Sequence, residues 1–273
     1  MGRIIFIHII FLLGFIKPVF ANGDTTLHLT LQKTIAGNFR DFYADNLGNI
    51  YLINADNRIK KLNANGDSLT VYNDTRRYGD LFSMDVSNPF KEVIFYRDFL
   101  TIVVVDKFLN RLNTINLRNY NILQAKAVAL SYDNNYWVFD QWSNTLKKID
   151  DNGKLLLESA DFRLAFTDEF NPQKIIDADG ILYLYDEKIG WKIFDYYGHF
   201  KKNIPFPNWT NVQAFNGMVY GWVNEKFVQS AVAFPDEQYF ATNFSASTFK
   251  KILRAGNNFY VLNADGLSIY NLQ

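Results

Sequence analysis

The sequence predicts an all-β fold, a six-bladed β-propeller with four strands in each blade. The main observation is a short apolar and aromatic segment that ends in a polar residue and occurs six times. Its polar end residues are spaced by 43, 43, 46, 38 and 39 positions, and a repeat of this length built only of strands is typical of propeller blades. Aromatic residues, which favour pleated and half-buried surfaces, make up 17% of the chain. The six copies are IYLIN (50–54), VIFYR (93–97), YWVFD (136–140), LYLYD (182–186), YGWVN (220–224) and FYVLN (259–263).

Turn residues divide each unit into strands. In the first unit, Gly48 and Gly66 stand in Leu-Gly-Asn and Asn-Gly-Asp turns, where a positive φ is needed. Gly153 and Gly217 stand at turns of the third and fifth units, and we expect alanine at either position to cost about 1 kcal/mol or more. The units form one domain over residues 22–273. The predicted blades cover approximately residues 38–75, 80–122, 125–160, 171–206, 211–245 and 250–273.

The sixth unit supplies only three strands before the last residue, Gln273. The missing outer strand is expected at the other end of the chain, where LHLTLQKTI (27–35) alternates between apolar and polar residues. The sequence therefore predicts that residues 26–36 complete the last blade and fasten the ring between its two termini. Removal of residues 22–37 should then expose a blade edge and make the protein sensitive to proteases.

The second unit departs from the others at its first turn. It has no glycine there and uses Asn88-Pro89-Phe90 instead. The simplest interpretation is a blade with a longer connection between its first two strands.

Residues 1–21 are predicted to be a secretory signal. Arg3 supplies positive charge, IIFIHIIFLLGFI (4–16) is the apolar core, and Val19-Phe20-Ala21 is the cleavage region. The alternative is an uncleaved anchor helix, but the run is short for a bilayer span and Lys17-Pro18 interrupts its end. We therefore expect an exported protein, located in the periplasm or on the periplasmic side of the outer membrane.

The composition limits the classes of partner. The chain has no cysteine, so packing alone must hold the fold, and an anchor on a lipid-modified cysteine is not expected. Its 28 Lys and Arg residues balance 28 Asp and Glu residues, which leaves no basic field to attract nucleic acid or anionic lipid.

Common catalytic constellations do not occur in the sequence. The histidines, His8, His28 and His199, are too sparse to build a zinc site without cysteine. There is no G-x-S-x-G nucleophile elbow, no G-x-G-x-x-G motif and no Walker-type loop. We therefore expect a protein that is not an enzyme and has no cofactor.

Residues 48–66 and 133–153 follow one order: a turn glycine, an apolar strand, an Asn or Asp turn and a basic strand. This order resembles the NHL-repeat and gluconolactonase-like six-bladed propellers. The amino-acid sequence of the second unit resembles exported propellers of Bacteroidetes-type bacteria, whose roles lie in the cell envelope. The gluconolactonase-like resemblance implies an alternative function, a metal-dependent lactonase with Ca²⁺ or Mg²⁺ in the central channel. The competing interpretation is that each acidic residue caps a turn through its own side chain. The candidate metal ligands are Asp45, Asp85, Asp133 and Asp177, together with Asn88.

The six polar residues that end the repeated segments are also expected to serve turns, because Asn and Asp side chains bond to the backbone two residues further on. Arg97 cannot do this, and we expect it in a surface ion pair with Asp98 or Asp106. The six residues are Asn54, Arg97, Asp140, Asp186, Asn224 and Asn263.

The candidate interface consists of aromatic residues of the third to fifth units. Arg97 is added to it because Arg97 cannot fill the turn role of the other polar residues in the repeat. The sharpest candidate is KNIPFPNWT (202–210), where two prolines stiffen a loop that is expected to display Phe206 and Trp209. Packing between blades is the alternative interpretation. The candidate interface residues are Trp142, Trp191, Phe206, Trp209 and Arg97.

We expect a non-enzymatic protein-interaction propeller of the bacterial cell envelope, a periplasmic subunit that docks on an outer-membrane or secretion assembly. Its partner is expected to be a protein, without nucleic acid, a lipid anchor or a transmembrane segment after signal cleavage. Two alternatives stay open: the metal-dependent lactonase, and a carbohydrate-binding propeller that stacks sugars on Trp142, Trp191 or Trp209.

Overall fold

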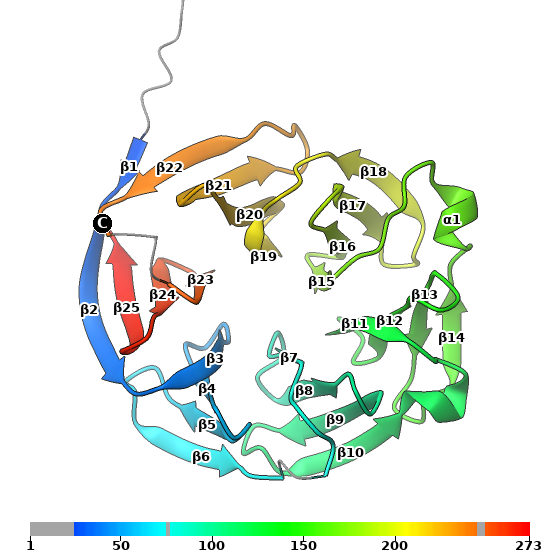
Figure 1. The fold of residues 1–273 in the computed structure, drawn as a ribbon, viewed down its shortest axis with the longest axis horizontal. Coiled ribbons are helices and arrows are strands. Elements are labelled where there is room, and N and C mark those ends of the chain that lie inside the picture. The colour runs from blue at the N-terminus through cyan, green and yellow to red at the C-terminus, as the bar shows by residue number, and fades with distance from the viewer. Residues whose placement is uncertain (1–24, 75–76, 245–248) are drawn as a thin grey trace, which may run out of the picture.

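Six antiparallel β-sheets stand around a common axis as the blades of a propeller (Figure 1). The computed structural model describes residues 25–74, 77–244 and 249–273, so the predicted signal over residues 1–21 lies outside the described residues. Each blade is built on four antiparallel strands, which confirms the predicted all-β, six-bladed fold.

The strands of a blade are called A to D from the axis outward, and in the first five blades they follow one another along the chain. Blade 1 contains β3 (Phe39–Ala44), β4 (Ile50–Asn54), β5 (Ile59–Leu62) and β6 (Ser68–Tyr72). Blade 2 contains β7 (Ser83–Asp85), β8 (Lys91–Tyr96), β9 (Thr101–Asp106) and β10 (Arg111–Asn116). Blade 3 contains β11 (Ala125–Leu130), β12 (Tyr136–Asp140), β13 (Thr145–Ile149) and β14 (Leu155–Glu158). Blade 4 contains β15 (Lys174–Ala178), β16 (Ile181–Asp186), β17 (Gly190–Asp195) and β18 (Phe200–Ile204). Blade 5 contains β19 (Thr210–Phe215), β20 (Met218–Val223), β21 (Lys226–Ala231) and β22 (Gln238–Thr242). Blade 6 contains β23 (Lys251–Ala255), β24 (Asn258–Leu262), β25 (Gly266–Leu272) and β2 (Leu29–Ala36).

The repeated apolar segments form the B strands, which are buried on both faces because each blade stacks against the next. In β12 all five residues are buried. The buried apolar side chains form six clusters, one between each pair of adjacent blades. Between blades 6 and 1, Tyr260 packs against Phe42 with ring centroids 6.3 Å apart. The interface that closes the ring is therefore as apolar in character as the other five.

The ring is closed by β2, as the sequence predicts. This strand pairs antiparallel with β25, from Leu29 opposite Leu272 to Ala36 opposite Gly266, with one register shift near Gln32. It supplies the outer strand that the C-terminal unit lacks. The two ends of the described chain lie side by side at the rim of the propeller (Figure 1).

A second fastening at the same place was not expected from the sequence. A short strand, β1 (Thr25–Leu27), pairs parallel with β22, so the residues just before β2 belong to blade 5. The Asn243 side chain secures the crossing point, because it accepts a hydrogen bond from Leu29 N at 3.0 Å and donates one to Leu29 O at 2.9 Å. The predicted single strand over residues 27–35 is thus two strands that join two blades.

Polar contacts are buried between blades 1 and 2. Lys61 Nζ and the Tyr51 hydroxyl both donate to Glu92 Oε1, each at 2.7 Å, and the Lys61 and Glu92 side chains are almost fully buried. Burial raises the pKa of Glu92, while hydrogen bonds from Lys61 and Tyr51 lower it. Such a pair fixes how two blades meet, since removing one member would leave the other charge buried and unpaired.

Helical structure in the described residues is confined to two connections between blades. A single turn of 3-10 helix, η1 (Leu117–Tyr120), precedes blade 3, and one short α-helix, α1 (Phe162–Ala165), precedes blade 4. A search of the described residues for a helix long and apolar enough to cross a membrane finds none.

The predicted turn glycines have the backbone conformation that the sequence requires. Gly153 has φ of 78° and Gly217 has φ of 67°. An added Cβ at Gly217 would meet no atom within 4 Å, whereas at Gly153 it would come within 2.4 Å of the Tyr120 ring. The two positions therefore share the backbone strain of a left-handed residue but differ in steric room.

We predict that Gly217→Ala lowers the free energy of unfolding by about 1 kcal/mol, the backbone cost alone. Gly153→Ala should lower it further, because the Tyr120 ring must also move. Urea denaturation of both variants, and of Gly153→Ala in a Tyr120→Ala background, measures the difference. An equal loss for Gly153→Ala with and without the Tyr120 ring would contradict the steric part of this prediction.

Candidate functional site

Two of the predicted interface residues are buried. Trp191 and Trp209 are each only 1% exposed, in the apolar cluster between blades 4 and 5. Their rings meet edge to face at 6.3 Å, Phe206 stacks on Trp209 at 5.5 Å, and Trp209 Nε1 donates to Glu237 at 2.9 Å. The expectation that the 202–210 loop displays Trp209 is wrong, because packing between blades takes up these large rings.

Of the other three predicted interface residues, Phe206 is half-buried against Trp209, and Trp142 and Arg97 lie on turns between strands B and C. Trp142 is 67% exposed on the turn of blade 3. The Arg97 guanidinium stacks on the Phe82 ring at 3.9 Å, and the described residues contain no ion pair between it and Asp98 or Asp106. Asp106 instead accepts hydrogen bonds from backbone groups of its own turn. The expected ion pair is therefore wrong, and a partner contact by Trp142 or Arg97 stays a prediction.

The candidate metal ligands on the A strands and their turns bind protein groups instead of facing one another. Asp45 accepts hydrogen bonds from Leu47 N at 3.0 Å, Asn49 N at 2.8 Å and the Tyr51 hydroxyl at 3.0 Å. Asp85 accepts from Ser87 N and from Leu130 N, both at 2.9 Å. Both carboxylates thus serve turns, and Asp85 also joins blade 2 to blade 3.

The remaining two carboxylates have similar roles. Asp133 pairs with Lys148 at 2.7 Å, and Asp177 accepts hydrogen bonds from the Ser131 hydroxyl at 2.8 Å and Trp137 Nε1 at 3.0 Å. Across the described ranges, no three His, Cys, Asp or Glu side chains come together in a way that could hold a metal ion. The described residues therefore do not form the carboxylate set that the lactonase alternative requires.

The polar residues that end the B strands mostly serve turns, as predicted. Asp140 accepts hydrogen bonds from Trp142 N and Gln124 N, Asp186 from Lys188 N and Asn171 N, and Asn263 from Asp265 N. Asp140 and Asp186 also hold the segment that leads into the A strand of their own blade. These side chains are part of the blade framework and not of an open ring of ligands.

An exposed apolar surface that the sequence did not predict lies on turns at one face of the ring. Leu47, Phe90 and Tyr132 belong to the turns between strands A and B of blades 1, 2 and 3, and they are 59%, 63% and 62% exposed. All three line one hollow of about 410 Å³. Tyr196 of blade 4 meets Tyr132 edge to face at 5.5 Å and lies 4.2 Å from the Tyr197 ring. We call these five residues the aromatic turn surface.

The turn that carries Phe90 is held in place by hydrogen bonds. Asn88 Oδ1 accepts from Phe90 N at 3.0 Å, and Asn88 Nδ2 donates to Asn134 Oδ1 of blade 3 at 3.1 Å. Lys91 Nζ donates to Asn134 O at 2.8 Å and pairs with Asp151 at 2.9 Å. The atypical Asn88-Pro89-Phe90 turn thus presents an aromatic ring on a backbone tied to the next blade, and its departure from the glycine turns is the signal in the sequence that could have indicated this surface.

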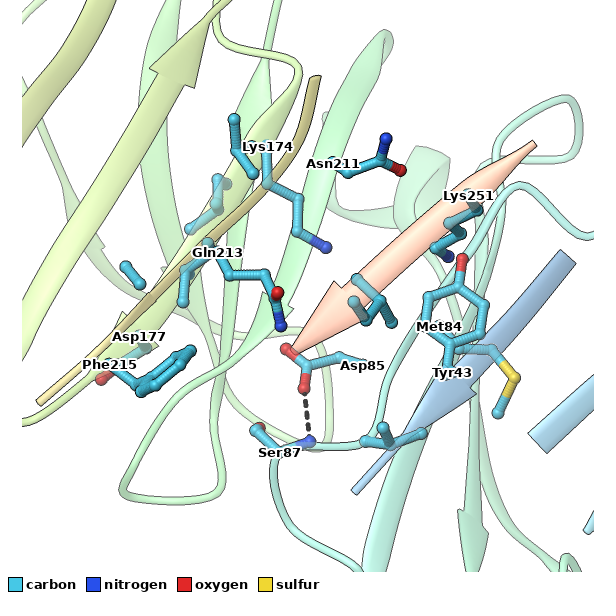
Figure 2. A pocket seen from close by; sticks show the side chains of 16 residues that line it. Tyr43, Met84, Asp85, Ser87, Lys174, Asp177, Asn211, Gln213, Phe215 and Lys251 are labelled. Carbon is cyan, nitrogen blue, oxygen red and sulfur yellow. Dashed lines mark hydrogen bonds between the residues drawn. The ribbon is translucent and has the colours of Figure 1, made fainter. Parts of the chain in front are cut away.

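A separate cavity of about 380 Å³ lies on the axis, among the A strands of blades 1, 2, 4, 5 and 6 (Figure 2). Lysine side chains from β15 and β23 line it, as do the carboxylates Asp85 and Asp177. Ser87 and Asp177 line both this cavity and the hollow under the aromatic turn surface. These two residues therefore stand between the axial cavity and the aromatic turn surface.

Comparisons with protein-family models and with curated protein sequences find no match for this chain. Among solved structures, it is similar to virginiamycin B lyase from Staphylococcus aureus, with a TM-score of 0.58 and 12% identity over 92% of this chain and 96% of that one. It is also similar to BamB from Moraxella catarrhalis, with a TM-score of 0.52 and 11% identity over 83% and 80% of the two chains. The Swd1 propeller domain from Myceliophteria thermophila gives 0.58 and 6% over 90% and 100%. At these identities the likeness shows the propeller fold alone.

We predict that Asp45→Ala lowers the free energy of unfolding by about 1–3 kcal/mol, because it leaves turn N–H groups without their acceptor. The loss should be the same in EDTA and in millimolar Ca²⁺ or Mg²⁺, since Asp45 is occupied by protein donors. Thermal unfolding of the wild type and the variant in each buffer makes the comparison. If EDTA destabilised the wild type as much as the substitution does, Asp45 would be a metal ligand.

Proposed function

We propose that this chain is a non-enzymatic protein-interaction propeller of the bacterial cell envelope. In this proposal it is an exported periplasmic subunit that docks on an outer-membrane or secretion assembly through the aromatic turn surface. The resemblance to exported propellers of Bacteroidetes-type bacteria and to the NHL-repeat and gluconolactonase-like groups belongs to the same proposal.

The observation that carries the proposal is the gathering of apolar side chains on anchored turns. Phe90 and Tyr132 each expose more than half of their surface, and both line the same hollow. Large exposed aromatics that meet in one place mark interaction sites, whereas single exposed apolar residues are ordinary. The hydrogen bonds of Asn88 and Lys91 fix the turn before a partner arrives, which reduces the entropy lost on binding.

The alternatives have less support from the described residues. The lactonase needs convergent carboxylates, and the four candidates are engaged with turns and neighbouring blades. The carbohydrate-binding alternative stacks sugars on Trp142, Trp191 or Trp209, and of these three only Trp142 is exposed to take part. A protein partner is therefore the function that this geometry favours.

The proposal is tested by crosslinking in intact cells of the source bacterium, followed by purification of the tagged protein from envelopes and quantitative mass spectrometry. We predict that the wild type recovers one envelope protein at fixed stoichiometry. A Phe90→Ser, Tyr132→Ser double variant should recover it at least about tenfold less, because hot-spot aromatics carry most of the energy of an interface.

Phe99→Ser is the matched control, because Phe99 is also an exposed phenylalanine of blade 2 but lies on the turn between strands B and C. It should recover the partner as well as the wild type does. An unpartnered, monodisperse wild-type protein in periplasmic extract would contradict the proposal. If the control variant recovered as little of the partner as the double variant does, the partner would not bind specifically through the aromatic turn surface.

A further inference from the structure

The axial cavity contains a lysine without a partner. Lys174, the first residue of β15, extends its ammonium group into the cavity (Figure 2). This ammonium group makes no hydrogen bond or ion pair with any residue in the described part of the chain. A partly buried ammonium group without a carboxylate beside it adds nothing to the stability of the blade.

Comparison with an equivalent lysine shows what Lys174 lacks. Lys174 lies opposite Tyr185 and Lys251 lies opposite Leu262, each one residue before the polar end of its B strand. Lys251 pairs at 2.7 Å with Asp41 of the next blade, and its ammonium lies 3.8 Å from the Tyr43 ring centroid. At the matching place beside Lys174, the next blade has Thr210 and Asn211, which carry no charge.

The groups around Lys174 suit a negatively charged oxygen. The Asn211 side-chain amide also lines the cavity, and its only hydrogen bond as a donor to the described residues is a 3.5 Å contact with Thr210. The backbone of Asn211 is left-handed, with φ of 51°. Burial and the nearby Lys174 ammonium lower the pKa of Lys251, while Asp41 raises it, so the two lysine charges act on one another within the cavity.

The rest of the lining restricts the ligand. Ile176 and Leu253 provide apolar contacts in the cavity. Asp85 and Asp177 line it too, and their negative charges repel every anionic group in the cavity, so the ligand should carry no anionic group besides the one that Lys174 binds directly. A volume of about 380 Å³ is in the range of small-molecule sites.

We propose that the axial cavity binds a small molecule with a single carboxylate, which accepts hydrogen bonds from the Lys174 ammonium and the Asn211 amide. The apolar body of this molecule lies against Ile176 and Leu253. This site is separate from the aromatic turn surface, so it gives the propeller a ligand-binding activity in addition to a docking role.

The test is isothermal titration of the purified protein with 4-phenylbutyrate and with its uncharged amide, 4-phenylbutyramide. The carboxylate should bind at least about tenfold more tightly than the amide, because a charge-assisted hydrogen bond to Lys174 is lost in the amide. An acetylated dipeptide with a free C-terminus, compared with its C-terminal amide, shows whether a chain end can supply the carboxylate as well as a free small molecule does.

Variants of Lys174 assign the site. Lys174→Met keeps the apolar stem and should weaken carboxylate binding at least about tenfold, whereas Lys174→Arg should stay within about threefold of the wild type. Lys60→Met, which removes an exposed lysine of β5, is the control and should bind like the wild type. Because the Lys174 ammonium makes no hydrogen bond or ion pair in the described chain, Lys174→Met should melt no lower than the wild type, which separates a loss of binding from a loss of folding.

Three results would overturn the proposal. The first is equal affinity for the carboxylate and its amide in both pairs of probes. The second is wild-type affinity in a folded Lys174→Met variant. The third is no measurable binding of either carboxylate up to about 10 mM, a concentration at which even weak small-molecule sites are occupied.

Discussion

The antiparallel pairing of β2 with β25 is the interaction on which the rest of this structure depends. It joins residues from the two ends of the described chain and completes the last blade. Without it, β25 would be an exposed edge strand, and the cluster that joins blade 6 to blade 1 would rest on an incomplete sheet. The pairing of β1 with β22 and the two hydrogen bonds of Asn243 add a second link, from the same segment to blade 5. One short stretch of chain therefore connects two blades across the point where the ring closes.

Closure matters for function because neither candidate site belongs to a single blade. The axial cavity takes side chains from five A strands, and the position of Lys174 beside Asn211 depends on how blade 4 meets blade 5. The aromatic turn surface joins turns of four successive blades, with Tyr132 and Tyr196 in contact across the boundary between blades 3 and 4. Buried polar contacts such as that of Lys61 with Glu92 fix the angle between blades, and so help to hold both sites. The fold thus supplies a rigid frame, and the chemistry lies where neighbouring blades meet.

The sequence predicted the strands and closure of the propeller well but the positions of the site residues poorly, and both outcomes have physical reasons. The B strands were recognisable because a strand buried on both faces is a continuous apolar run, and β2 because its alternation matched a missing outer strand. The division of this segment into β1 and β2 was not predictable from the sequence, because it depends on β22 of blade 5 lying beside β1. Trp191 and Trp209 were misplaced because a loop sequence does not tell which way a ring points. The sequence did not single out Lys174. Whether a lysine on an A strand meets an acidic residue of the next blade depends on strand register, and β-bulges alter this register in several blades. The Asn88-Pro89-Phe90 turn was recognised as atypical, but it was interpreted as a longer connection and not as a site, and it is no longer than the corresponding turns of blades 1 and 3.

Hydrogen exchange of the full-length protein, read by mass spectrometry on peptides from each blade, tests the closed ring most directly. We predict that amides of β25 and β2 exchange together and are protected to within about tenfold of those in β4 and β12, because all of them open with the ring as one unit. Fast exchange of β25 and β2 while β4 and β12 stay protected would contradict it. In that case the last blade would be open in solution, and the geometry of the axial cavity would not be held by closure.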